Sequence, residues 1–177
     1  MIKFQPGDIV VVHAKGFNWL RVVTGLYWNH AMLIDEPLGE DYGLLESIDK
    51  GTAPTLLSNY KGQHIAVYRY MGITPDQQQA IRLAARKLGA YHYDFLIFFR
   101  ILRRVGIRKG IRLIIQLWGK EYPLEIPKVD DKYIVCSEYC QQAYELAGIP
   151  LEDKGYLLTP DGLALCERLV CIYNGIY

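Results

Sequence analysis

Cys136 is the residue of this 177-residue chain with the clearest potential for covalent chemistry. The short extended run YIVC at residues 133–136 leads into SEYCQQAYELAG, whose apolar positions recur at helical spacing: Cys136, Cys140, Ala143 and Ala147. This spacing predicts a helix that begins at Cys136. The unpaired amides and the positive dipole at the start of a helix favour a thiolate over a thiol. Cys136 is therefore a candidate nucleophile.

A thiolate nucleophile needs a base that also carries the proton, and His30 is the first candidate. His30 stands in WNHAMLID, where it is a polar side chain in an otherwise apolar strand. A third group must orient the imidazole by accepting from its other ring nitrogen. Glu46 in GLLESID lies on the next predicted strand, one neighbour away in the sheet. We therefore predict that folding joins Cys136, His30 and Glu46, although His30 and Cys136 are far apart in the sequence.

Each of these residues also has a purely structural interpretation. A cysteine on an apolar helical face is usually a small core residue, and we interpret Cys140, Cys166 and Cys171 in that way. A strand histidine is often hydrogen-bonded and half-buried, and a strand carboxylate is often solvated. Residue types and spacing alone therefore leave a non-catalytic binding module open beside an enzyme.

The elements that must position these residues differ between the two parts of the chain. The first 70 residues are predicted to be mostly sheet, with strands in the runs 8–14, 20–35, 43–48 and 64–70. Residues 74–77 (TPDQ) then form a capping box that starts a helix ending at Gly89. The helix at Cys136 ends before Gly148, and a last helix is predicted from residues 159–161 (TPD) to about Leu169.

Composition excludes several classes of protein. With 51% apolar and 22% charged residues, the chain is neither disordered, collagen-like nor a coiled coil, and one domain over residues 1–177 is expected. The net charge of +1 gives no overall field toward nucleic acid or anionic lipid. The four cysteines lack CxxC spacing, so no metal site of that kind is expected. No signal peptide and no apolar stretch of about 20 residues is present, which favours a cytoplasmic protein, although release by another route stays open.

Seven segments together resemble a known family: PGDIVVV, NHAMLID, LLESIDKG, IAVYRY, YHYDF, YIVCSEYCQQAYELAGI and LTPDGLA. This series is similar to the YiiX-like branch of the NlpC/p60 superfamily of papain-like cysteine hydrolases, which is circularly permuted. In that branch the histidine strand precedes the cysteine, which is the order of His30 and Cys136 here. The most specific piece is CSE after a tyrosine-rich strand, with a Tyr-Asp pair upstream at residues 93–94.

The resemblance implies a fold and a reaction. The fold would be α+β and permuted papain-like, with an antiparallel sheet packed against helices and the nucleophile at a helix N-terminus. Cys136 matches the family nucleophile, His30 its base and Glu46 the acidic or polar third position. The reaction would be acyl transfer through a thioester, without metal or organic cofactor. Peptide amides of cell-wall type are the favoured substrate, and acyl esters or amides of lipids are the alternative.

Acyl transfer also needs hydrogen-bond donors for the oxyanion that forms on the substrate carbonyl. The backbone N–H of Cys136, at the start of its helix, is one candidate. Tyr93 and Tyr133 are candidates for the second donor or for substrate binding, in a chain with 14 tyrosines.

Residues 95–120 form a basic segment that departs from the family pattern, within an insertion expected at about 95–125. The segment carries seven Lys and Arg and no acid. Apolar residues recur there at helical spacing, opposite a set of arginines at Arg100, Arg103 and Arg104, with Arg108 following. These arginines either form the solvated face of a packing helix or meet an anionic membrane surface, which would allow lipid binding.

Nucleic acid is not expected, because the aromatic residues lie on the apolar face. The sequence does not predict the oligomeric state.

Overall fold

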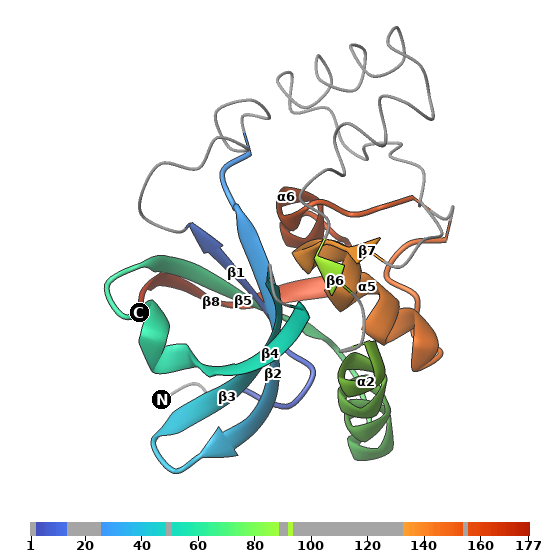
Figure 1. Ribbon diagram of the computed structural model, residues 1–177, viewed down its shortest axis with the longest axis horizontal. Coiled ribbons are helices and arrows are strands. Elements are labelled where there is room, and N and C mark those ends of the chain that lie inside the picture. Colours follow the sequence, from blue (N-terminus) through green and yellow to red (C-terminus); the bar gives the residue numbers. More distant parts are fainter. Residues whose placement is uncertain (1–2, 14–25, 49–50, 89–91, 94–132, 154–155) are drawn as a thin grey trace, which may run out of the picture.

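The computed structural model describes residues 3–13, 26–48, 51–88, 92–93, 133–153 and 156–177 (Figure 1). Within them lies a six-stranded sheet in the order β4-β3-β2-β1-β5-β8, in which every neighbouring pair is antiparallel. The strands are β1 (Ile9–His13), β2 (His30–Leu38), β3 (Asp41–Ile48), β4 (Gly51–Leu56), β5 (His64–Tyr70) and β8 (Leu169–Ile176). The described helices are α2 (Pro75–Lys87), α5 (Cys136–Leu146), α6 (Pro160–Ala164) and the 3-10 turn η1 (Leu57–Tyr60). The expected α+β class, with an antiparallel sheet and helices, is confirmed.

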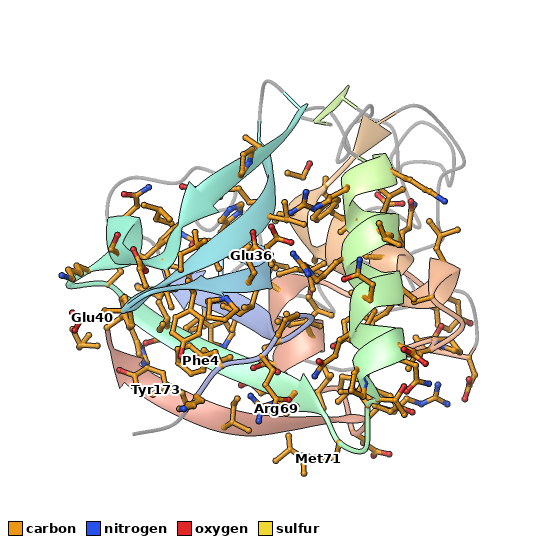
Figure 2. The ribbon with its side chains drawn as sticks, turned by 90° about the horizontal axis from the view of Figure 1, so that it is seen from below. Phe4, Glu36, Glu40, Arg69, Met71 and Tyr173 are labelled. Carbon is orange, nitrogen blue, oxygen red and sulfur yellow. The ribbon has the colours of Figure 1, made fainter. Side chains whose placement is uncertain are left out.

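The sheet is buried on both faces at its centre, because β1 is apolar at four successive positions. Ile9 and Val11 belong to a core that the sheet shares with α2 and α5, which lie side by side against one face (Figure 1). Val10 and Val12 belong to a second core on the other face. Figure 2 shows Phe4 beside Tyr173 at this second core, with ring centroids 5.9 Å apart.

The helix predicted after the first strands is α2, and its predicted start is confirmed. Thr74 Oγ1 accepts the backbone N–H of Gln77 at 3.3 Å, and Gln77 Oε1 accepts the backbone N–H of Thr74 at 2.9 Å. Such a cap stabilises a helix by about 1 kcal/mol. Ile81, Ala84 and Ala85 then face the core, and α2 packs against α5.

Near the edges of the sheet, one predicted element is wrong and one strand was not predicted. The last helix does not reach Leu169: α6 ends at Ala164, and Leu169 begins β8. The predicted helix start is present, since Thr159 caps α6. The residues from Leu169 onward form a strand because they pair with β5 at the edge of the sheet. Strand β4 was not predicted, because Gly51 and Pro54 disfavour a strand; a proline is tolerated at an edge strand such as β4.

The β2–β3 hairpin brings distant parts of the first 50 residues together. Its turn is at Gly39, which has the positive φ of 66° that glycine adopts freely. The two strands pair from Leu38↔Asp41 back to Met32↔Glu46. The start of β2 and the end of β3 therefore meet at the same end of the sheet. The strand predicted over 20–35 begins only at His30 within the described residues.

Part of the sequence lies outside the described residues. The basic segment is there, with Arg100, Arg103, Arg104 and Arg108, and so is the expected insertion at about 95–125. The membrane-surface interpretation and the single-domain span therefore stay predictions. In the described part of the chain, no helix has the length and apolar character required to span a bilayer.

Candidate active site

His30 and Glu46 lie at one end of the β2–β3 hairpin. His30 is the first residue of β2, and Glu46 stands opposite Met32 on β3, so both side chains are on the same face of the sheet. His30 Nε2 is 2.6 Å from Glu46 Oε2, and the side chains are only 18% and 9% exposed. A short, sheltered hydrogen bond of this kind orients the imidazole ring.

Cys136 approaches the same histidine from a different element. It is the first residue of α5, it is 5% exposed, and its side chain is hydrogen-bonded to His30. Because Glu46 takes Nε2, the ring nitrogen left for the sulfur is Nδ1. The imidazole of His30 therefore stands between a thiol and a carboxylate, each at its own nitrogen.

Two backbone N–H groups also lower the pKa of the Cys136 thiol. One belongs to Ser137 in the first turn of α5, where amides have no partner within the helix. The other belongs to Ala31, which lies just beyond the last β2–β3 pair at Met32↔Glu46. The sheet and the helix thus each contribute one amide that stabilises negative charge on the sulfur.

The ionisation of Cys136 and His30 follows from these contacts. Burial raises the pKa of the Cys136 thiol, but the hydrogen bond and charge of His30 and the two amides outweigh burial and hold this pKa below its ordinary 9.0. Burial lowers the pKa of His30, but the hydrogen bonds and charges of Cys136 and Glu46 raise it from 6.5 to about 10. Both shifts favour a thiolate beside an imidazolium over a thiol beside a neutral imidazole.

Tyr60 is a further residue of the site, and the sequence analysis did not find it. It ends the 3-10 turn η1, and its hydroxyl donates to Glu46 Oε2 at 2.7 Å. Burial raises the pKa of Glu46, but the hydrogen bonds from His30 and Tyr60 lower it below the usual range. Burial and the charge of Glu46 raise the pKa of Tyr60, so its hydroxyl stays a donor. No signal in the sequence distinguishes Tyr60 from the other tyrosines, because its contact with Glu46 depends on the fold.

The site connects the two faces of the sheet. Glu46 shares its face with Met32, whose side chain belongs to the second core, and Tyr60 packs against that same core. Cys136 comes from α5, which packs on the opposite face through the core that contains Tyr139 and Cys140. His30, the first residue of β2, contacts both Glu46 and Cys136.

The backbones of Tyr93 and Tyr133 lie on a small separate sheet. Strands β6 (His92–Tyr93) and β7 (Tyr133–Ile134) pair in parallel, with His92 opposite Tyr133. This pairing places the YHYDF and YIVC segments side by side, just before the helix that begins at Cys136. Their side chains are outside the description, so their role as oxyanion donors or substrate contacts stays a prediction.

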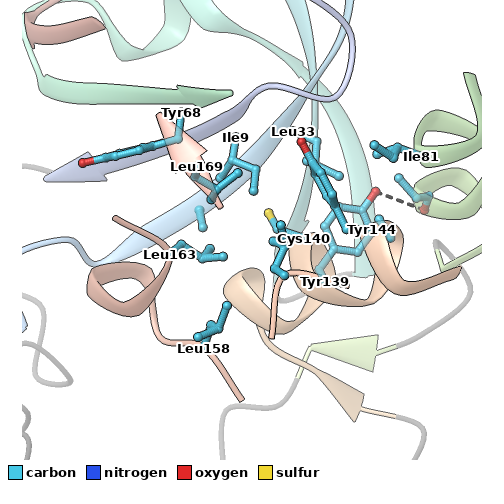
Figure 3. Close-up of a cluster of buried hydrophobic side chains, with 14 of the residues drawn as sticks. Ile9, Leu33, Tyr68, Ile81, Tyr139, Cys140, Tyr144, Leu158, Leu163 and Leu169 are labelled. Carbon is cyan, nitrogen blue, oxygen red and sulfur yellow. Dashed lines mark hydrogen bonds between the residues drawn. The ribbon is translucent and has the colours of Figure 1, made fainter. Parts of the chain in front are cut away.

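The other cysteines have different surroundings from Cys136. Cys140 points into the core shown in Figure 3, where the Tyr139 hydroxyl donates to the carbonyl of Ala85. Burial and the charge of Cys136 raise the pKa of Cys140 well above its ordinary value. Cys166 is half-buried and donates to the carbonyl of Leu151. The packing role predicted for Cys171 is wrong, because Cys171 is exposed on the edge strand β8.

Comparison with known proteins places the fold. No family model and no curated protein matches the sequence. Among solved structures, the metalloprotein YiiX from Escherichia coli O157:H7 superposes on the chain with a TM-score of 0.65 and 15% sequence identity, over 98% of each chain. The chain has the fold of YiiX. The resemblance predicted from the sequence segments is thereby confirmed at the level of the fold.

YiiX is described as a metalloprotein, so we tested whether the described residues of this chain fit a metal ion. They contain no group of three or more His, Cys, Asp or Glu side chains able to hold one. The nearest approach to such a group is the candidate site, where Glu46 and Cys136 bind different nitrogens of His30. Ligands on two edges of one ring do not converge on a common point, so these residues do not fit a resident metal ion.

Proposed function

We propose that this chain is a cysteine hydrolase that cleaves an amide bond through a thioester acyl-enzyme. The observation that carries the proposal is a continuous series of hydrogen bonds, from Tyr60 through Glu46 and His30 to Cys136 at the start of α5. A nucleophile, a base and a group that orients the base are the elements of nucleophilic acyl transfer. Their arrangement here spans three separate elements of the fold, which supports selection for chemistry over packing alone.

The reaction begins with attack of the Cys136 thiolate on the substrate carbonyl carbon. The carbonyl π electrons move to oxygen, and the backbone N–H groups at the start of α5 are the donors for this oxyanion. When the oxyanion collapses, the C–N bond breaks and the imidazolium of His30 protonates the departing nitrogen. An amine leaves and a thioester remains on Cys136.

Water completes the cycle at the same residues. His30, now neutral, takes a proton from water as the oxygen attacks the thioester carbon. Collapse of the second oxyanion releases a carboxylic acid and restores the Cys136 thiolate beside the His30 imidazolium. Glu46 holds the ring and its positive charge throughout, and Tyr60 holds Glu46.

The chain order supports a permuted papain-like arrangement. The sheet residue His30 precedes the helix residue Cys136, as in the permuted branch that the sequence resembles. For the substrate, that resemblance favours peptide amides of cell-wall type. The alternative is an acyl group of a lipid, hydrolysed or transferred at a membrane surface, and the basic sequence of residues 95–120 is the observation that favours it.

A substrate panel with matched cysteine variants tests the proposal. Purified protein is incubated with cell-wall peptides and with phospholipid vesicles, and new amino groups and released fatty acids are measured. We expect new amino groups, with loss of at least about 1,000-fold in rate for Cys136→Ala and no change for Cys171→Ala, which alters an exposed cysteine. Turnover that survives Cys136→Ala in a folded protein overturns the proposal. Release of fatty acid alone, dependent on Cys136, selects the lipid alternative.

A further inference from the structure

Asp161 is a buried carboxylate that contacts the chain directly before His30. It lies in the first turn of α6, it is 8% exposed, and both of its oxygens accept backbone N–H groups. Oδ2 accepts from Tyr27 at 2.9 Å, and Oδ1 accepts from Trp28 at 2.7 Å. A carboxylate that receives two consecutive amides fixes the direction of the chain at that point.

The backbone of residues 27–29 also contacts β1. The carbonyl of Tyr27 lies 2.7 Å from His13 Nδ1, and the N–H of Asn29 donates to the carbonyl of Val12 at 3.0 Å. These bonds hold the segment to the sheet. The bonds to Asp161 are of another kind, because they tie the same segment to helix α6.

The helix that carries Asp161 is itself attached to the helix that carries Cys136. Gln141 of α5 is fully buried; its Oε1 accepts the N–H of Leu158 at 2.9 Å, and its Nε2 donates to the carbonyl of Tyr156 at 2.7 Å. The next residue, Thr159, caps α6 by accepting the N–H of Gly162 at 3.0 Å. Helices α5 and α6 also contact each other.

Cys136 and His30 are therefore connected by a second route, which does not use the direct contact between them. It leads from Cys136 along α5 to Gln141, through the 156–159 segment into α6, and from Asp161 to the residues before His30. A brace of this form sets the distance between two groups that belong to different layers of the fold. Reacting groups must be held within a fraction of an ångström, which sheet pairing alone does not ensure across layers.

We propose that Asp161 is a positioning residue, which braces the start of β2 against the α5–α6 layer and so holds His30 in contact with Cys136. This inference rests on the proposed function, because it assigns Asp161 a part in keeping the site assembled. Asp161 does not touch the reacting atoms. It acts through the backbone of Tyr27 and Trp28, three and two residues before His30.

The pH dependence of Cys136 alkylation by iodoacetamide tests the brace, since it reports the thiolate without any substrate. Labelling of each cysteine is followed by mass spectrometry for the full-length wild-type chain and for Asp161→Asn. The amide keeps the size of the side chain but offers one acceptor oxygen and turns an N–H toward the other backbone amide. We expect the midpoint for Cys136 to rise by about one pH unit, because His30 and the Ala31 amide then lie less often against the sulfur.

Asp8→Asn is the matched control. Asp8 is also buried, and it accepts hydrogen bonds from the N–H of Gln5 and the guanidinium of Arg69. It directly precedes the first residue of β1, whereas His30 pairs with Val12 near the other end of that strand. A merely structural role for buried carboxylates predicts that both variants lower the melting temperature and neither moves the midpoint. The brace predicts a shift for Asp161→Asn alone.

A second variant covers the case in which Asp161→Asn does not fold. Gln141→Met breaks the same brace at α5 and is expected to raise the midpoint in the same direction by a smaller amount. An unshifted midpoint in the folded variants, beside a low midpoint in wild type, overturns the brace and leaves the proposed function standing. A wild-type midpoint at or above the ordinary 9.0 overturns the proposed function and the brace together.

Discussion

Strand β2 carries two buried charged contacts, one at its start and one in its second half, and their chemistry differs. At the start, His30 pairs with Glu46 and Cys136. In the second half, Asp35 accepts from Arg82 Nε at 2.9 Å and from Arg86 Nη2 at 2.6 Å, both on α2. Guanidinium groups stay charged at all relevant pH values, so the contact at Asp35 can only hold the helix to the sheet. An imidazole gains and loses a proton, so the contact at His30 can also move one.

The two cysteines of α5 repeat this difference within one turn of helix. Both are buried, yet the pKa of Cys136 is lowered and the pKa of Cys140 is raised. Cys136 has the imidazole of His30 and two amide donors, whereas Cys140 is surrounded by core side chains. Burial by itself therefore raises the pKa of a thiol and makes it less reactive. The partners of Cys136 at the start of α5 lower this pKa.

Removal of the imidazole is expected to have the largest effect on this contrast. In wild type, alkylation of Cys136 should rise at the lowered pKa of its thiol, at lower pH than alkylation of Cys140. In His30→Ala, burial acts without the imidazolium, so the midpoint should move above the ordinary 9.0 and resemble that of Cys140. Turnover should fall by at least about 1,000-fold.

A half-buried ring, that of His64, supplies the control for that variant. His64 bonds the hydroxyl of Tyr27 and the side chain of Asn174, and His64→Gln should leave the labelling profile of Cys136 in place. If His30→Ala keeps the wild-type labelling profile, the start of α5 alone makes the sulfur reactive. The difference between Cys136 and Cys140 is then not caused by His30.

Disruption of the second half of β2 should change stability and leave the thiol alone. Arg82→Met removes one of the two guanidinium groups at Asp35 but keeps most of the aliphatic side chain. We expect urea denaturation to show a loss of about 1–3 kcal/mol in the free energy of unfolding, as for a lost hydrogen bond to a charged group. The midpoint for Cys136 alkylation should stay at its wild-type value. A shift of that midpoint would show that the two halves of β2 do not act independently.

The smallest expected effect comes from the outermost group of the site. Tyr60→Phe removes the hydroxyl that donates to Glu46 and leaves the ring beside His30. The pKa of Glu46 should rise toward its usual range, and we expect turnover to fall by about 3- to 10-fold, equivalent to roughly 1 kcal/mol. Tyr42→Phe removes a hydroxyl that accepts the N–H of Phe4, at the opposite end of β3 from Glu46, and serves as its control, with unchanged turnover. Equal rates for both variants would remove Tyr60 from the site.

Much of the site was accessible from local patterns. A helix start at Cys136 follows from spacing over a dozen residues, and the contact of His30 with Glu46 follows from adjacent strands whose turn lies between them. Tyr60 and Asp161 were not predicted as site or positioning residues. Each reaches its partner through contacts that no period or neighbouring strand indicates, across 14 residues for Tyr60 and more than 130 for Asp161.

The edges of the sheet show the same limit. The TPD sequence starts α6 as predicted, but the helix ends at Ala164. Residues from Leu169 onward form β8 instead, because they pair with β5. Local propensities differ by small amounts, so a row of backbone hydrogen bonds to a distant strand overrides them. The failure of the helix prediction at Leu169 has this cause.

For this chain, neighbouring residues specify which side chains are available for chemistry and which elements carry them: a thiol at a helix start, an imidazole and a carboxylate on paired strands. Packing of α5 against the sheet decides that the thiol meets the free nitrogen of the imidazole, and that the Ala31 amide reaches the sulfur. Hydrogen bonds within a helix or hairpin depend on short stretches of chain. Contact between Cys136 and His30 depends on the mutual fit of two whole layers, and only the complete fold supplies it.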